Sequence, residues 1–219
     1  MTRRRALSLT VDAAMAILML WLMSYPVTRG LLRHGVCGVS LAALIIFHHL
    51  LNLPWYRALP RGRWKAPRVL TAASDMALFA AFAALTASSL VMAGDVFSFV
   101  PFAMPWWGRD LHSFSTAWLF ALSFFHLGLH GSGFWNGLRA ILGRIMGRVV
   151  LPAAISIFAM CLLAFWKSGL WKNMFLLEQA AGHAAPWLFY VQLCGTGAFF
   201  CAVGRICLVV LTGKRSVAP

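Results

Sequence analysis

The sequence predicts an all-α membrane protein with six transmembrane helices. Of its 219 residues, 61% are hydrophobic and only 11% are charged, and its mean hydropathy is +0.79. The apolar residues also gather into stretches of about 20 residues, which is the length of helix that crosses a hydrocarbon core ~30 Å thick. A soluble domain of this length would be less apolar and more charged.

We expect the six spans at residues 8–28, 33–53, 70–93, 111–130, 149–166 and 187–211. The first follows three arginines, as a signal peptide does, but residues 24–29 offer no small-residue cleavage site, so this span should be retained. We interpret residues 1–219 as a single membrane domain. Within it, residues 1–140 form a four-helix core and residues 141–219 add two spans.

The formal charge of +14 raises the question of nucleic-acid binding. Apart from Arg205, near the inner end of the last span, the basic residues lie outside or at the edges of the spans. With six crossings, 13 of the 19 fall on one side and five on the other. The larger group comprises Arg3, Arg4, Arg5, Arg57, Arg61, Arg63, Lys65, Arg68, Arg139, Arg144, Arg148, Lys214 and Arg215. By the positive-inside rule both termini are cytoplasmic. Because orientation in the membrane accounts for these residues, we do not expect nucleic-acid binding.

Two pairs of histidines share one spacing, His34 with His48 and His112 with His126. The 14 residues between the members of a pair turn a helix through about 1400°, some 40° short of four full turns, and rise roughly 21 Å. Each pair therefore lies on one helical face at two depths. Spans two and four run in the same direction, so His34 should meet His112 near the outer surface and His48 should meet His126 near the inner one. Two such bis-imidazole sites suit two b-type haems.

A weak internal duplication supports this interpretation. Residues 30–34 align with 108–112, and Phe47-His48 aligns with Phe125-His126, which places Asn52 opposite His130. Asp12 and Asp75 occupy corresponding places in the first and third spans. The core therefore resembles two copies of a helical hairpin. The last two spans contain no histidine and have no counterpart in the repeat.

Several polar residues near the inner histidines have two interpretations each. His49 is also oriented toward the His34 face, but the repeat favours His48 as the ligand. His130 lies four residues after His126, which is the spacing of a zinc or copper pair; alternatively it contacts a haem propionate or lines a quinone pocket. Asp12 and Asp75 either carry protons for quinone chemistry or pair with inner-side arginines, and we favour the arginine pairing.

Small and basic residues beside the histidines complete the candidate cofactor site. Gly35, Gly38, Ser115 and Thr116 follow the outer histidines and would leave room for a flat macrocycle, although close helix packing also uses small residues. Arg33 and Arg109 are candidate partners of the outer haem propionates, and Arg57 and Arg139 of the inner ones. Interfacial anchoring of these arginines is the alternative.

Several chemistries are excluded by missing motifs. The chain has no Cys-x-x-Cys-His for covalent haem, no P-loop and no Gly-x-Gly-x-x-Gly fingerprint. All five cysteines fall within spans, so we do not expect disulfides. No segment is large enough to form a soluble substrate domain. We therefore expect a subunit of an oxidoreductase system rather than a self-contained enzyme.

The chain resembles the flavinylation-associated cytochrome family of bacterial membrane proteins over roughly residues 8–140. The resemblance is carried by Asp12, Arg33-His34, residues 48–55, Asp75, Leu111-His112 and residues 126–130. It implies a di-haem b cytochrome in the bacterial inner membrane, working beside an extracytoplasmic flavoprotein. The 14-residue spacing is also shared with the cytochrome b of respiratory bc complexes and with ferric-reductase-like six-span proteins. It therefore specifies haem better than it specifies the partner.

The expected function is electron transfer across the membrane through two non-covalent b haems held by His34, His48, His112 and His126. The donor would be a quinone or a cytoplasmic-side carrier, and the acceptor would lie outside the cytoplasm. The alternative is a transporter or channel in which intramembrane His and Asp residues move protons or a metal ion. The sequence leaves the direction of electron flow, quinone binding and oligomeric state open.

Overall fold

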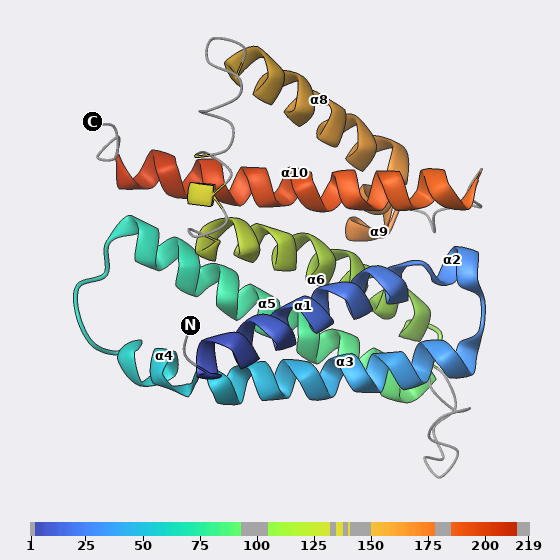
Figure 1. Cartoon of the computed structure of the whole chain (residues 1–219). Coiled ribbons are helices and arrows are strands. Elements are labelled where there is room, and N and C mark those ends of the chain that lie inside the picture. The colour runs from blue at the N-terminus through green and yellow to red at the C-terminus, as the bar shows by residue number, and fades with distance from the viewer. Residues whose placement is uncertain are drawn as a thin grey trace. The chain divides into compact units, whose positions relative to one another are not determined.

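A computed structural model describes residues 3–92, 105–131, 135–137, 140, 150–177 and 185–213. In these residues the regular secondary structure is entirely α-helical (Figure 1), which confirms the all-α class. The helices are α1 (Arg3–Met23), α2 (Tyr25–Thr28), α3 (Leu31–Leu51), α4 (Leu53–Ala58), α5 (Ala66–Met92), α6 (Gly108–His130), α8 (Val150–Ser168), α9 (Leu170–Met174) and α10 (Pro186–Thr212).

Four of the described helices are long and apolar enough to cross a membrane: α1, α3, α5 and α10. These correspond to four of the six expected spans and indicate a membrane protein. The other two expected spans, 111–130 and 149–166, are helical but do not meet the same measure. The 23 residues of α6 reach about 34 Å, but its histidines, serines and threonine lower its hydropathy. The apolar part of α8, Pro152–Ser168, is shorter.

Turn residues set the ends of the first helices. We expected the first span to continue to residue 28, but α1 ends at Met23, where the Ser24 hydroxyl donates to the Trp21 carbonyl at 2.5 Å. The short helix α2 follows, with a proline in its first turn, where the missing N–H costs nothing. Gly30 then precedes α3 with φ of +147°, a conformation that only glycine adopts readily.

The chain divides into two compact units, Met1–Trp64 with Thr86–Arg109 and Lys65–Leu85 with Asp110–Pro219. In the first unit, α1 and α3 pack as an antiparallel hairpin (Figure 1). Arg4, near the start of α1, donates from Nη2 to the Leu51 carbonyl at the end of α3, at 2.7 Å. A cation at this position satisfies a carbonyl that has no partner within its own helix and complements the helix dipole.

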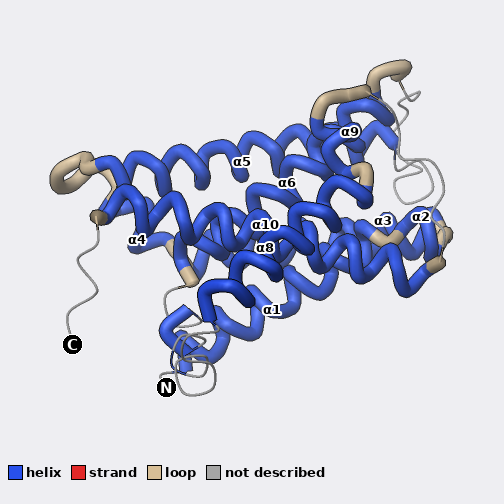
Figure 2. The backbone as a smooth tube through the Cα atoms, turned by 90° about the horizontal axis from the view of Figure 1, so that it is seen from above, coloured by secondary structure: helices blue, strands red, loops and turns tan. Residues whose placement is uncertain are grey.

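In the second unit, α10 lies against both α6 and α8 (Figures 1 and 2). Glycines allow α6 and α10 to approach until their backbones touch. A Cβ atom on Gly128 of α6 would collide with the Cys201 carbonyl oxygen of α10, and one on Gly204 would collide with the Phe125 carbonyl oxygen of α6. A Cβ atom on Gly197 would lie 2.8 Å from the Phe124 ring. Such close crossings are typical of membrane helices that associate through small residues.

The middle of α6 is buried, with Ala117 and Phe120 fully inaccessible. Near its N-terminal half, Trp118 donates its indole N–H to the Met174 carbonyl of α9 at 3.0 Å. A helix covered by neighbouring helices needs less apolar surface than one that faces lipid. This explains how α6 carries more polar residues than the four spanning helices. By contrast, α8 exposes Ile155, Ile157 and Met160, as a lipid-facing helix does.

Candidate functional site

The four histidines of the repeat lie on two long helices, at corresponding places in each. His34 and His48 lie near the two ends of α3, and His112 and His126 lie near the two ends of α6. We call His34 and His112 the first histidines and His48 and His126 the second histidines. The two helices belong to different compact units.

In the first unit, the second histidine is held by a carboxylate. The Nδ1 atom of His48 lies 2.7 Å from Oδ1 of Asp12, which is on the neighbouring helix α1. An ionised carboxylate only accepts hydrogen bonds, so Nδ1 carries the proton and donates it. The lone pair of the neutral ring is then on Nε2. This is the tautomer in which a histidine binds a metal through Nε2 while its other nitrogen is oriented by a carboxylate.

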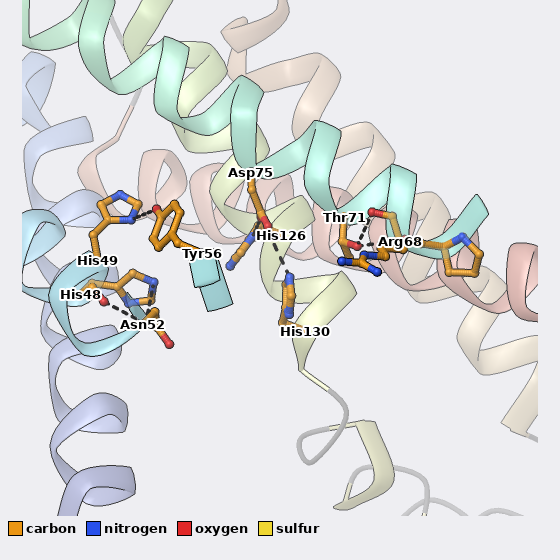
Figure 3. Close-up of polar contacts among 10 residues, drawn as sticks. His48, His49, Asn52, Tyr56, Arg68, Thr71, Asp75, His126 and His130 are labelled. Atoms are coloured by element: carbon orange, nitrogen blue, oxygen red, sulfur yellow. Dashed lines mark hydrogen bonds and ion pairs between the residues drawn. The ribbon is translucent and has the colours of Figure 1, made fainter. Parts of the chain in front are cut away.

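Asn52 occupies the Nε2 side of the same ring. Its Nδ2 atom lies 3.3 Å from His48 Nε2 and also donates to the His48 carbonyl at 2.9 Å (Figure 3). The amide donates to the Nε2 lone pair, which fits the tautomer set by Asp12. Because an amide hydrogen bond is much weaker than a bond to iron or zinc, Asn52 would leave Nε2 when a metal binds there.

The second unit repeats this arrangement. The Nδ1 atom of His126 on α6 lies 2.7 Å from Oδ1 of Asp75 on α5. His130, one turn further along α6, has its Nε2 atom 4.0 Å from the same oxygen, and its ring centroid lies 4.4 Å from that of His126. Figure 3 shows the Asp75 side chain directed toward both rings. Only 14% of the Asp75 side chain is exposed, so its interaction with His126 is little screened by solvent.

These contacts correct one expectation from the sequence. We expected Asp12 and Asp75 to pair with inner-side arginines, but each carboxylate pairs with a second histidine. The aspartates follow the starts of α1 and α5 by the same number of residues. Helix α1 packs antiparallel to α3, and Asp75 of α5 reaches His126 near the end of α6. The carboxylate therefore comes level with the second histidine in both hairpins, rather than with the arginines that flank the helices.

His49, the alternative to His48, has a different partner. Its Nδ1 atom lies 2.6 Å from the Tyr56 hydroxyl of α4 (Figure 3). This contact ties the end of α3 to the short helix that follows it. The two neighbouring histidines thus have different partners: Asp12 for His48, which matches the Asp75 contact of His126, and Tyr56 for His49.

Two positions one turn after the first histidines bear on whether a flat cofactor fits there. A Cβ atom on Gly38 would meet no atom within 4 Å, so close packing does not explain this glycine in the described structure. The Thr116 hydroxyl is buried and has no hydrogen-bond partner among the described residues, whereas neighbouring Ser115 donates to the Leu111 carbonyl at 2.6 Å. The open space beside Gly38 in the first unit and the unsatisfied Thr116 hydroxyl in the second unit are each compatible with a bound group. The donor set of four imidazoles also fits haem iron.

The other predicted site residues are placed less specifically. His34 makes an edge-to-face contact with Tyr25, with ring centroids 4.9 Å apart. The Arg33 side chain folds back so that Nε lies 3.5 Å from the Cβ position of Gly30. Arg109 lies in the first turn of α6 and Arg57 lies in α4. Arg139 lies outside the described residues.

Asp75, His126 and His130 also form a group that could hold a metal ion. One ligand atom from each lies within 4.8 Å of the others. Two imidazoles and a carboxylate are ligands that zinc and other first-row transition metals accept. The sequence predicted the two histidines of this group but not the carboxylate.

Three glycines near this group were not predicted to matter. Gly128 and Gly204 make the backbone contacts between α6 and α10 at Phe125 and Cys201, directly beside His126. Gly197, Cys201 and Gly204 share one face of α10 at helical spacing. This small-residue face is the signal that could have identified α10 as a packing partner of α6.

The described residues therefore form an all-helical structure whose long apolar helices indicate a membrane protein, with one aspartate–histidine pair in each compact unit. Comparison of the chain with protein-family models, curated proteins and solved structures gave no match.

Proposed function

We propose that this chain is a transmembrane electron carrier that binds two b-type haems non-covalently through His34, His48, His112 and His126. The observation that carries the proposal is the repeated contact of Asp12 with His48 and of Asp75 with His126, both at 2.7 Å through Nδ1. A carboxylate in this position fixes the tautomer and orientation of a metal-binding imidazole. Haem supplies a one-electron change at its iron when it is bound.

The proposal assigns a role to the polar and small residues beside the four histidines. Asp12 and Asp75 orient the second histidines and keep their Nε2 lone pairs available. Gly38 leaves space one turn after His34, and the Thr116 hydroxyl offers a donor one turn after His112. Arg33 and Arg109 offer positive charge to the propionates. Ala117 and Phe120 in the middle of α6 are fully inaccessible, which keeps water from that part of the helix.

The membrane, the orientation and the redox partners in this proposal are inferred from the sequence. The distribution of basic residues supports six spans with both termini in the cytoplasm. The resemblance to flavinylation-associated cytochromes supports the bacterial inner membrane and an extracytoplasmic flavoprotein as acceptor. A quinone or a cytoplasmic-side protein would be the donor. The chain would then act as the haem subunit of an oxidoreductase system.

We expect protein purified from haem-replete cells to show a reduced-minus-oxidised b-type spectrum with two haems per chain. The spectrum measures low-spin haem with two nitrogen ligands, and a pyridine haemochrome assay divided by protein concentration gives the stoichiometry. Because no Cys-x-x-Cys-His motif is present, acid acetone should extract all of the haem. A preparation that is colourless after expression with added haem precursor would contradict the proposal.

Gly38→Leu tests the space beside His34. No atom lies within 4 Å of a Cβ atom at this position, so the folded apoprotein should accept leucine, but the side chain would occupy the place proposed for the macrocycle. We expect the haem content to fall from two haems per chain to one, without a loss of expression. Val39→Leu, at an exposed position on the same helix, should retain both haems. Full haem content in Gly38→Leu would refute the clearance role.

A second candidate function is transport of a transition-metal ion or of protons. It is favoured by the approach of Asp75, His126 and His130 to within 4.8 Å of one another, since such groups inside membranes line ion pathways. This function predicts a haem-free protein that binds zinc. Zinc stoichiometry, measured by elemental analysis of protein dialysed against zinc, should approach one per chain for the transporter and stay near zero for the haem-loaded electron carrier.

A further inference from the structure

The two carboxylates of the site, Asp12 and Asp75, both contact the second histidines and not the first. Asp12 and Asp75 bond to the second histidines, and the first histidines lie 14 residues earlier in α3 and α6, about 21 Å along the helix axis. A carboxylate bonded to one histidine cannot also reach the other. The negative charge of Asp12 and Asp75 is therefore placed at the second histidines of both hairpins.

A carboxylate that accepts the Nδ1 proton makes the imidazole a stronger electron donor. A stronger donor, with a negative charge beside it, stabilises the oxidised form of a bound haem iron more than the reduced form and lowers its reduction potential. Both effects act through the ligand ring. Asp12 and Asp75 are therefore positioning residues for the metal site, and they need not touch the cofactor.

We propose, on the basis of the proposed haem function, that Asp12 and Asp75 lower the reduction potential of the haem bound by the second histidines and leave that of the other haem unchanged. Electrons move from the haem of lower potential to the haem of higher potential. The placement of the two carboxylates therefore favours electron transfer from the second-histidine end toward the first-histidine end.

The two aspartates should differ in strength. The Asp75 side chain is 14% exposed, whereas that of Asp12 is 45% exposed. A more buried charge is less screened and acts more strongly on its neighbour. Asp75 should therefore contribute more than Asp12 to the difference between the two haem potentials.

The test is a spectroelectrochemical titration of the full chain. We expect Asp75→Asn to raise the lower of the two midpoint potentials by an amount equivalent to at least a tenfold change in relative affinity for the two oxidation states, or 59 mV for one electron. Asp12→Asn should give a smaller rise in the same direction. Asp75→Glu restores the charge and should return the midpoint most of the way toward the wild-type value.

Variants that keep one haem show which haem responds. In a His112→Ala background, which retains the second-histidine haem, Asp75→Asn should raise the single midpoint. In a His126→Ala background, which retains the other haem, it should have no effect. Two haems with midpoints unchanged in both Asp→Asn variants would overturn the inference while leaving the haem function intact. A protein without haem would instead overturn the proposed function itself.

Asp75→Asn is also the variant more prone to lose cofactor, since Asp75 contacts both His126 and His130. Asp12→Asn alters only the other hairpin and provides an independent measurement of the same effect. A rise in the midpoint of Asp12→Asn supports the inference even if Asp75→Asn binds one haem. The inference is refuted if the lower midpoint potential is the same as in the wild type in all three variants, Asp12→Asn, Asp75→Asn and Asp75→Glu.

Discussion

His126→Ala should reduce the haem content of the purified protein from two per chain to one. In the proposed function the His126 imidazole would be one of the two histidines that hold one haem iron, and alanine offers no replacement atom. Asp75, which lies 2.7 Å from Nδ1 of this ring, is on the opposite side from Nε2. Its carboxylate therefore cannot replace the lost metal ligand. The pyridine haemochrome assay measures the loss, and the reduced spectrum of the remaining haem should stay that of a bis-histidine site.

Two neighbouring histidines provide matched controls for this variant. His130→Ala removes a ring whose centroid lies 4.4 Å from that of His126 but that is not among the four proposed ligands, so both haems should remain. His49→Ala removes the partner of the Tyr56 hydroxyl and should also retain both. If His130→Ala loses as much haem as His126→Ala, or if His126→Ala retains two haems, the ligand assignment is wrong. Equal loss of bound zinc in both variants would favour the metal-ion candidate.

The sequence predicted the helices well because the signal for a membrane helix is local. Apolar stretches gave the approximate positions of α1, α3, α5 and α10, and the structure changes their ends mainly where Ser24, Pro26 and Gly30 interrupt the chain. The duplication was also readable, because it depends only on spacing. Asn52 and His130, aligned in the repeat, each contact the second histidine of their own hairpin.

The partners of the aspartates could not be predicted, because they depend on how one helix is rotated against the next. Asp12 is separated from His48 by 36 residues, and Asp75 from His126 by 51. Composition placed arginines near the same membrane surface, which made them plausible partners. The antiparallel packing of each hairpin instead brings a histidine level with the carboxylate. A search for Asp and His at matching depths in successive helices would have found both pairs.

The role of α10 was missed for a related reason. We expected the last two spans to be additions to the core because they lack histidine. However, α10 packs against α6 through Gly128 and Gly204, next to His126. Apolar residues dominate the hydropathy signal, and the glycines that decide which helices touch contribute little to it. The C-terminal part of α6 is thus contacted by Asp75 of α5 at His126 and by α10 at Phe125 and Gly128.

Gly128→Ala should destabilise the protein, although the same change usually stabilises a helix. Alanine normally gains about 0.5–1 kcal/mol over glycine in a helix. At Gly128, however, the added Cβ would collide with the Cys201 carbonyl oxygen and would lie 3.0 Å from the Arg205 amide nitrogen. Both obstacles are backbone atoms and cannot rotate away, so α6 and α10 must separate. Forced overpacking of this kind costs about 1–3 kcal/mol, which should appear as a lower thermal unfolding temperature in detergent.

Gly137→Ala is the matched control, because this glycine is helical and a Cβ atom there would meet nothing within 4 Å. It should leave the unfolding temperature unchanged or raise it. Opposite signs for the two alanine variants would show that contact with α10, rather than helix propensity, decides the effect at Gly128. If both variants stabilise the protein, the close crossing of α6 and α10 is contradicted.

Because Gly128 lies two residues after His126, the separation of α6 from α10 should also lower haem content in Gly128→Ala, whereas Gly137→Ala should retain two haems per chain.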